Sequence, residues 1–272
     1  MKINLPYIPD RSKKERVDGL TIITDYGWSI DEVKSIISRK AQYIDLVKLH
    51  VSLFSANDLK DKIALLYQSG IKVYFSGTLF EIFFIRDMLE TYIKYLKELG
   101  LNHIEISDSS IEIPESEKLR LITELSKEFT VISEIGAKQN DVILPVIGNW
   151  TQKIKNELAA GAWKITIEGG EYGNSGIYDK KSEPKHTLIQ SLLSLDQSQI
   201  IWETLFDFQQ LWFINKVGVN VNLGNIDERD VLKLEHMRLG LHSSTFFNYI
   251  PAEQKNTFSK KRNPLFNLDY QI

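Results

Sequence analysis

The 272-residue chain is 43% hydrophobic and 25% charged, which is ordinary for a soluble globular protein. Its formal net charge of −3 lacks the basic field of a nucleic-acid-binding protein, and the absence of cysteine excludes disulfides, thiolate metal sites and a cysteine nucleophile. No apolar run approaches the roughly 18 residues of a membrane span, and the N-terminus lacks the apolar stretch of a signal peptide. We therefore expect a cytoplasmic protein that binds neither nucleic acid nor membrane.

Short apolar, β-branched runs that end at a polar residue recur eight times, and a helix-like segment follows each. The runs are Leu20–Thr24, Ile44–Val47, Ile71–Phe75, Ile104–Ile106, Val131–Ile135, Trp163–Ile167, Ile200–Trp202 and Val217–Leu223. Strands that alternate with helices predict βαβ units and a parallel sheet. Eight such units, in a chain near the roughly 250 residues typical of this fold, predict an α/β protein with a single (β/α)8 TIM barrel. We expect the barrel over 19–250, with an N-terminal extension (1–18) and a C-terminal tail (251–272).

Helix signals fill the connections between these runs. Ser29 and Glu32 form a capping-box pattern at the start of the first helix. We expect one long, aromatic-rich helix over Leu79–Leu99, and a last barrel helix after Asp227. The aromatic segments Leu79–Leu99 and Phe206–Ile214 would offer apolar surface for self-association, so we expect a homo-oligomer.

Charged residues gather at the ends of the predicted strands. Barrel enzymes carry their chemistry at the carboxyl ends of the strands, so these side chains should open on one face. The two that lie within a run, Glu105 and Glu134, have an alternative role as satisfied polar residues of the barrel interior. The six charged candidates are Lys48, Glu105, Glu134, Lys138, Glu168 and Glu203.

Other assignments also have structural alternatives. Lys48 and Glu168 could form an ion pair inside the barrel mouth. Asp25 and Asp108 follow strands and could cap the next helix, which is the commoner role of such aspartates. The residues alone leave these alternatives open.

Two glycine- and asparagine-rich segments are candidates for binding an anion. A glycine-dense loop over residues 169–176 follows the sixth strand, where such loops act as lids or cradle ligands, and it includes Gly173. The turn with Asn222, Gly224 and Asn225 precedes the last barrel helix. A helix N-terminus at this position commonly binds phosphate in barrels.

Several stretches, taken in order from about Gly19 to Thr245, resemble the phosphosulfolactate synthase family, barrel enzymes that add sulfite to phosphoenolpyruvate on the way to coenzyme M. The matching stretches include Gly19-Leu20-Thr21, Tyr43–Lys48, Ser76–Glu81, Ile104–Asp108, Glu134-Ile135-Gly136, Ala160-Gly161-Ala162, Glu168-Gly169, Gly176–Asp179, Asn220–Ile226 and Asp230–Leu241.

The resemblance implies an Mg²⁺-dependent lyase that acts on a small anionic substrate and forms a carbon–sulfur bond. Mg²⁺ would stabilise the negative charge that develops on the substrate carboxylate, and Lys48 or Lys138 would donate a proton. The implied catalytic residues are Lys48, Lys138, Glu168 and Glu105. The implied substrate- and phosphate-binding residues are Asn222, Gly224, Asn225 and Gly173, and the implied metal ligands are Asp25, Asp108, Glu134 and Glu203.

The chain departs from the family pattern at several strand ends. The departures are Leu49-His50-Val51-Ser52 in place of a Gly-Trp-Gly-Thr-like turn, Asp108-Ser109-Ser110 for Asp-Gly-Thr, Ala137-Lys138 for paired lysines, Gly170 for an arginine, Glu203-Thr204-Leu205 for Glu-Ala-Pro, and His242 for a basic residue. Loss of cationic positions leaves two alternatives to the family reaction: a diverged barrel enzyme with the same Mg²⁺–enolate apparatus and another substrate, and a non-catalytic scaffold. If the family reaction holds, we expect arginine at position 170 to raise sulfite addition.

Overall fold

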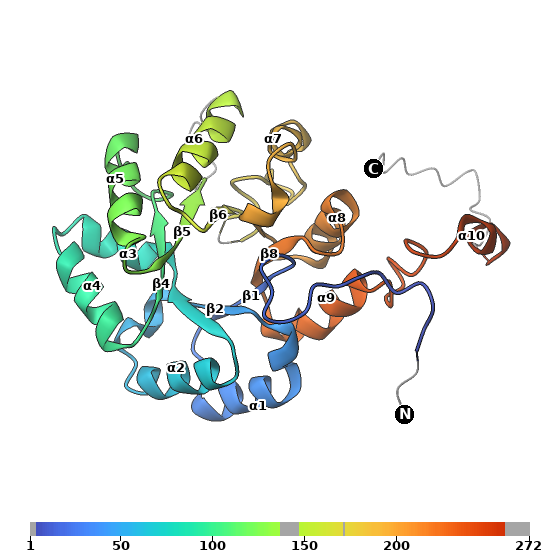
Figure 1. Ribbon diagram of the computed structural model, residues 1–272, viewed down its shortest axis with the longest axis horizontal. Helices are drawn as coiled ribbons and strands as arrows, with labels where there is room; N and C mark the ends of the chain where they lie inside the picture. Colours follow the sequence, from blue (N-terminus) through green and yellow to red (C-terminus); the bar gives the residue numbers. More distant parts are fainter. Residues whose placement is uncertain (1–3, 137–146, 171, 259–272) are drawn as a thin grey trace.

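Eight parallel strands form a nearly closed barrel in a computed structural model that describes residues 4–136, 147–170 and 172–258 (Figure 1). The strands are hydrogen-bonded in the order β3-β2-β1-β8-β7-β6-β5-β4, and β3 and β4 are also in contact. The predicted TIM barrel is therefore confirmed. The strands are β1 (Thr21–Asp25), β2 (Leu46–Leu49), β3 (Lys72–Phe75), β4 (His103–Ser107), β5 (Thr130–Ile135), β6 (Lys164–Ile167), β7 (Ile200–Glu203) and β8 (Asn222–Ile226).

The helices lie outside the strands in the ribbon view (Figure 1). The predicted capping box is present, because Ser29 and Glu32 each accept from the other's backbone N–H. None of the described helices has the length and apolar character needed to cross a bilayer. The α-helices are α1 (Ile30–Lys40), α2 (Leu59–Gln68), α3 (Gly77–Phe84), α4 (Leu89–Glu98), α5 (Glu115–Leu125), α6 (Ile147–Ala159), α7 (His186–Leu192), α8 (Asp207–Val217), α9 (Val231–Arg238) and α10 (Ala252–Phe258), and the 3₁₀ helices are η1 (Ala41–Tyr43), η2 (Val51–Ser55), η3 (Gln197–Gln199) and η4 (Glu228–Asp230).

Two predicted elements are wrong in their bounds. The single helix expected over Leu79–Leu99 is two helices, α3 and α4, and the chain between them passes through Asp87, whose φ of 53° no α-helix adopts. The eighth strand does not begin at Val217, which closes α8, but at Asn222. Asn222 therefore lies at the start of its strand.

Alternation along the strands separates the two faces of the barrel wall. A small apolar cluster fills the interior, and a larger one packs between strands and helices. Since successive side chains of a strand point to opposite faces, a residue two positions beyond an interior residue is also interior and lies nearer the carboxyl end. Four polar residues stand two positions beyond Ile22, Leu46, Ile132 and Ile201 of the interior cluster, and they are Thr24, Lys48, Glu134 and Glu203.

Helix α3 lies at the seam where β3 and β4 are not hydrogen-bonded to each other. Its first residue, Gly77, is so close to β4 that an added Cβ would lie 2.4 Å from the Cβ of Ser107. The Gly77 N–H donates to the Glu105 carboxylate at 2.7 Å, and the Ser107 hydroxyl donates to Glu81 of α3 at 2.7 Å. These polar contacts therefore hold α3, which follows β3 directly in the chain, against β4 at the seam.

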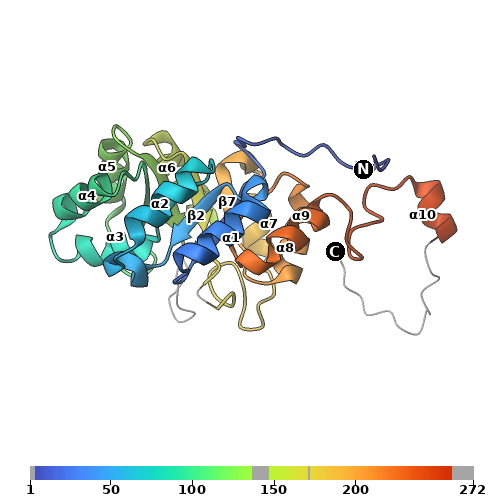
Figure 2. The ribbon, with the colours of Figure 1, turned by 90° about the horizontal axis from the view of Figure 1, so that it is seen from below.

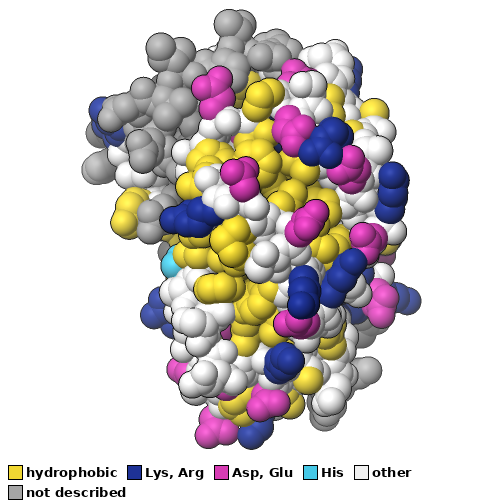
Figure 3. Space-filling model, turned by 90° about the vertical axis from the view of Figure 1, so that its left-hand side faces the viewer, with side chains coloured by type: hydrophobic (Ala, Val, Ile, Leu, Met, Phe, Trp, Pro, Cys, Tyr) yellow, Lys and Arg dark blue, Asp and Glu magenta, His cyan; other side chains and the backbone are white. Residues whose placement is uncertain are grey.

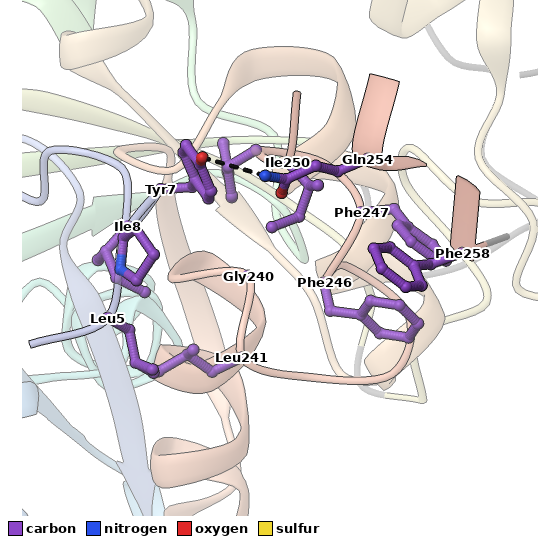
Figure 4. A pocket seen from close by; sticks show the side chains of 12 residues that line it. Leu5, Tyr7, Ile8, Gly240, Leu241, Phe246, Phe247, Ile250, Gln254 and Phe258 are labelled. Carbon is purple, nitrogen blue, oxygen red and sulfur yellow. Dashed lines mark hydrogen bonds between the residues drawn. The ribbon is translucent and has the colours of Figure 1, made fainter. Parts of the chain in front are cut away.

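The N-terminal segment and the segment after α9 lie together away from the barrel (Figures 1 and 2). Between them is an apolar cavity of about 730 Å³, lined by residues such as Leu5, Ile8, Phe246 and Phe258 (Figure 4). Nearer the barrel, Arg16 pairs with Asp45 at 3.0 Å. This ion pair fixes the N-terminal extension beside the start of β2, at the end of the barrel opposite the carboxyl ends of the strands.

Candidate active site

A pocket of about 560 Å³ opens at the carboxyl ends of the strands. Most of its residues stand at or just beyond the ends of β1, β2, β3, β5, β6, β7 and β8. Of the six charged candidates, the structure brings Lys48, Glu134, Glu168 and Glu203 to this pocket, and Glu105 contacts Lys48. Lys138 lies outside the described residues. The lining residues are Thr24, Tyr26, Lys48, His50, Val51, Ser76, Thr78, Ser110, Glu134, Glu168, Tyr172, Glu203 and Asn225.

Lys48 is the one lysine or arginine among the described residues that line the pocket. Its Nζ lies 2.7 Å from Glu203 Oε1 and 3.6 Å from Glu105 Oε1, and all three side chains are buried. Desolvation lowers the pKa of Lys48, but the attraction of Glu105 and Glu203 outweighs it and holds this pKa well above the ordinary value. Lys48 is therefore a permanent positive charge at neutral pH.

Glu105 is fully buried beside Lys48, on the interior face of β4. Besides the Gly77 N–H, it accepts a contact from the Thr166 hydroxyl at 3.5 Å. Its pKa is raised to about 7, mainly by desolvation and also by the neighbouring Glu134 and Glu203, while Lys48 and the Gly77 N–H oppose the rise. Glu105 therefore changes its charge near neutral pH, next to a lysine that does not.

Glu81 was not among the residues singled out from the sequence, yet it belongs to the polar network beside the pocket. The hydroxyls of Ser107 and Ser109 lie 2.7 and 3.4 Å from Glu81 Oε1, and 3.0 and 2.6 Å from Glu134 Oε1. The Ser110 N–H also donates to Glu81 at 3.0 Å. A glutamate among the apolar residues of a buried helix face was the available signal for this position.

The glycine-rich loop after β6 contacts two of the pocket carboxylates through its backbone. The Gly169 N–H donates to Glu203 Oε2 at 3.1 Å, and the Gly170 N–H donates to Glu168 Oε1 at 2.7 Å. Gly170 has a φ of 79°, and a Cβ at this residue would lie 1.8 Å from Ser175 Oγ. Ser175 thus occupies the space that a side chain at position 170 needs. The expectation that arginine at this position would raise activity stays a prediction, and it requires Ser175 to move from its place in this loop conformation.

Asp25 and Asp108, two of the predicted metal ligands, do not line the pocket. Asp25 accepts the backbone N–H groups of Gly27 and Trp28, both at 2.7 Å, and its other oxygen lies 3.5 Å from Lys62 of α2. Asp108 lies between two lysines, with contacts of 2.8 Å to Lys118 and 2.7 Å to Lys153. The helix-cap alternative is therefore wrong for both residues: Asp25 caps the turn before α1, whose N-cap is Ser29, and Asp108 joins β4 to helices α5 and α6.

The predicted phosphate-binding residues separate as well. Asn222 accepts the Leu20 N–H at 3.0 Å and donates to the Ile200 carbonyl at 2.8 Å, at the end of the barrel opposite the pocket. Gly173 accepts a hydrogen bond from Gln209 of α8. The Cβ position of Gly224 lies 3.2 Å from Ile201 of β7. Of the four residues predicted to bind phosphate, Asn225 alone lines the pocket, beside the Thr24 hydroxyl at 3.3 Å.

The chemistry of the lining residues fits a hard divalent cation that the substrate helps to bind. Among the described lining residues, Glu134, Glu168 and Glu203 supply carboxylate oxygens, which are the ligands that such an ion prefers. Within the described part of the chain, no group of three acidic or histidine side chains is arranged to hold a metal ion by itself. Mg²⁺ usually binds through one or two carboxylates and completes its shell with water and substrate oxygens. Glu134, Glu168 and Glu203 are thus the described residues that could hold such an ion.

A (β/α)8 barrel with an acidic, lysine-containing pocket at its strand ends is the architecture of a barrel enzyme. Residues 9–244 match the model of the (2R)-phospho-3-sulfolactate synthase (ComA) family. Phosphosulfolactate synthase of Bacillus subtilis is 34% identical over 245 residues, covering 88% of this chain and 97% of that protein. The enzyme of the same name from Methanocaldococcus jannaschii is 34% identical over 235 residues, covering 84% and 94% of the two chains. The chain belongs to the phosphosulfolactate synthase family, which confirms the resemblance found in the sequence.

Solved structures support the fold alone. The 3-keto-L-gulonate-6-phosphate decarboxylase of Vibrio cholerae superposes with a TM-score of 0.52 at 11% identity, covering 86% of this chain and 100% of that one. The thiamine phosphate pyrophosphorylase of Pyrococcus furiosus gives the same TM-score at 7% identity, covering 82% and 96%. At such low identities these structures say nothing about the reaction of this chain.

Proposed function

We propose that this chain catalyses the Mg²⁺-dependent addition of sulfite to phosphoenolpyruvate, which forms phosphosulfolactate. The observation that carries the proposal is the family match over residues 9–244, in a chain that keeps a buried lysine and three glutamates at the strand-end pocket. Even a paired buried charge is often no more stabilising than well-packed apolar side chains of similar volume. Their retention in one pocket therefore argues against a scaffold that has no chemistry to perform.

The reaction requires two anions to meet and negative charge to be stabilised. The sulfur lone pair of sulfite forms a bond to C3 of phosphoenolpyruvate, the electrons of the C2–C3 double bond move towards the carboxylate, and C2 then takes a proton. The phosphate ester is retained. We assign Lys48 to stabilise the charge that develops on the substrate carboxylate, since its raised pKa keeps it positive.

Proton transfer to C2 needs a different group. A donor works best when its pKa lies near the working pH, and the raised pKa of Lys48 makes it a poor donor at neutral pH. We assign this step to Lys138, which lies outside the described residues. Glu105 lies 3.6 Å from Lys48 on the interior side of the pocket. When ionised, it partly neutralises the lysine and so weakens the attraction of Lys48 for the substrate.

We propose Mg²⁺ as the cofactor. Of the predicted ligands, Glu134 and Glu203 line the pocket, and Glu168 is the third carboxylate there. When bound, the ion would help to stabilise negative charge on the substrate carboxylate. These carboxylates would hold the ion.

A second candidate function is a related addition to a less anionic substrate. The observation that favours it is the glycine at position 170, because no cation can be placed there without displacing Ser175. We test the two candidates with a panel that pairs sulfite with phosphoenolpyruvate, and then other nucleophiles and enol acids with Mg²⁺, followed by mass detection of products. Phosphosulfolactate from the first pair supports the family reaction, whereas turnover confined to another pair supports the second candidate.

We further propose that the chain forms a homo-oligomer through apolar surface. The face on the left in Figure 1, around α3, α4 and α5, carries a band of hydrophobic side chains among charged ones (Figure 3). A groove of about 450 Å³ lies there on α3 and α4, and Ile85 and Met88 beside it are 58% and 41% exposed. Light scattering at micromolar concentration should show a mass above the 31.4 kDa of one chain. A single species of one chain's mass would contradict this proposal.

A further inference from the structure

His50 follows Lys48 on the same face of the barrel wall. Side chains alternate along a strand, so His50 faces the interior as Leu46 and Lys48 do. The pairing of β1 and β2 continues to this residue, because the His50 N–H donates to the Asp25 carbonyl at 2.9 Å. The half-buried imidazole therefore lines the pocket two residues beyond Lys48, nearer to its mouth.

The turn after β2 determines where the proton of the imidazole lies. The backbone N–H of Ser52 donates to His50 Nδ1 at 3.2 Å, and the Ser52 hydroxyl lies 2.8 Å from the same nitrogen. Because a backbone N–H can only donate, Nδ1 accepts, and the ring proton is on Nε2. Within the described part of the chain, Nε2 has no hydrogen-bond partner.

An aromatic contact adds to this constraint. The ring of Tyr26 lies against the ring of His50, with the two centroids 5.2 Å apart. One nitrogen and one side of the imidazole are thus engaged by the protein itself, and the remaining polar group is an N–H donor. A ligand that lies over Lys48 would meet this donor at the mouth of the pocket.

We propose that His50 is a specificity-determining residue whose Nε2–H donates a hydrogen bond to an oxyanion oxygen, phosphoryl or carboxylate, of the substrate bound above Lys48. This inference rests on the proposed function for the identity of the substrate. A neutral N–H donor suits this position, because it can bind an anionic oxygen of a substrate that Lys48 attracts and adds no further charge to the pocket. A hydrogen bond to a charged group corresponds to about one to two decades of affinity.

Two variants separate the hydrogen bond from packing. His50→Phe keeps an aromatic ring against Tyr26 and removes the N–H, whereas His50→Gln offers an amide N–H at about the position of Nε2. We expect His50→Phe to raise KM for phosphoenolpyruvate by roughly 10- to 100-fold with kcat little changed, because the contact exists before and during the reaction. We expect His50→Gln to recover most of this loss. Equal losses in both variants, or none in His50→Phe, would overturn the proposal.

A second measurement does not depend on turnover. Nitrogen-15 NMR of the histidine-labelled full chain should show His50 as the neutral, Nε2-protonated tautomer, and titration with phosphoenolpyruvate should shift Nε2. A shift with inorganic phosphate identifies the phosphoryl group as the acceptor, and a shift with pyruvate but not with phosphate identifies the carboxylate. An Nδ1-protonated ring, or no response to any of the three, overturns the proposal even if the protein makes phosphosulfolactate. A shift without product instead refutes the proposed function and leaves the role of His50 standing.

Discussion

Replacing Lys48 with methionine should destabilise the protein and abolish its activity, for two separable reasons. Lys48 Nζ lies 2.7 Å from Glu203 and 3.6 Å from Glu105, and all three side chains are buried. At an effective dielectric constant of about 20, the shorter contact alone corresponds to a Coulomb energy of roughly 6 kcal/mol. Part of this offsets the desolvation of the charges, so removal of one partner from a buried pair costs about 3–5 kcal/mol. We expect urea unfolding of Lys48→Met to show a loss in this range with an unchanged m-value.

The matched control is the double variant Lys48→Met/Glu203→Gln. The second substitution removes the Glu203 carboxylate that would otherwise be buried without Lys48. The glutamine oxygen can still accept the Gly169 N–H, which Glu203 accepts at 3.1 Å. We expect the double variant to regain much of the lost stability but none of the sulfite addition, since the positive charge is still missing. The loss of unfolding free energy in the double variant is compared with the summed losses of Lys48→Met and Glu203→Gln. If the two differ by less than about 0.5 kcal/mol, Lys48 and Glu203 do not form an ion pair.

Two further predictions concern Glu105 and Gly170. Burial raises the pKa of Glu105 from 4.5 to about 7, so folding favours its protonated form. The stability of the wild type relative to Glu105→Gln should therefore fall as pH rises from about 4.5 to about 7, by roughly 3 kcal/mol, and then level off. Urea unfolding at pH 5 and pH 8 measures this, and an equal difference at both would refute it. Gly170→Ala should destabilise the protein more than Gly218→Ala. Both residues have positive φ, so alanine strains the backbone at each of them. The difference is steric, because a Cβ at position 170 meets Ser175 Oγ whereas one at position 218 meets nothing within 4 Å. Ser175→Gly should recover part of the loss, and thermal unfolding that ranks the two alanine variants equally would contradict the steric argument.

The barrel was predictable because eight apolar runs alternate with helical segments at regular intervals. Which side chains of each strand point into the barrel could not be predicted from the same pattern. Parallel strands are buried on both faces and appear as continuous apolar runs, so the pattern does not distinguish inside from outside. Asp25 faces α2 because Thr24 faces the interior, and only the packing of Ile22 in the central cluster reveals this.

The errors at the candidate site have identifiable causes. Asn222 was assigned to the pocket because the eighth strand was expected to end near it, whereas the strand begins there. Glu81 was missed because it comes from a helix at the β3–β4 seam and not from a strand end. The strand-end rule was sufficient for Lys48 and Glu203, since both stand at or near the last interior position of a regular strand.

The most direct test of the central claim is the fate of a labelled carbon. The purified full-length chain is incubated with phosphoenolpyruvate carrying carbon-13 at C3, sulfite and Mg²⁺, and carbon-13 NMR follows the label. We predict that the alkene signal of C3 is replaced by the signal of a saturated carbon bonded to sulfur, and that the conversion is lost in Lys48→Met/Glu203→Gln and on chelation of Mg²⁺. An unchanged alkene signal, under conditions in which the Bacillus subtilis relative converts the substrate, would contradict the account.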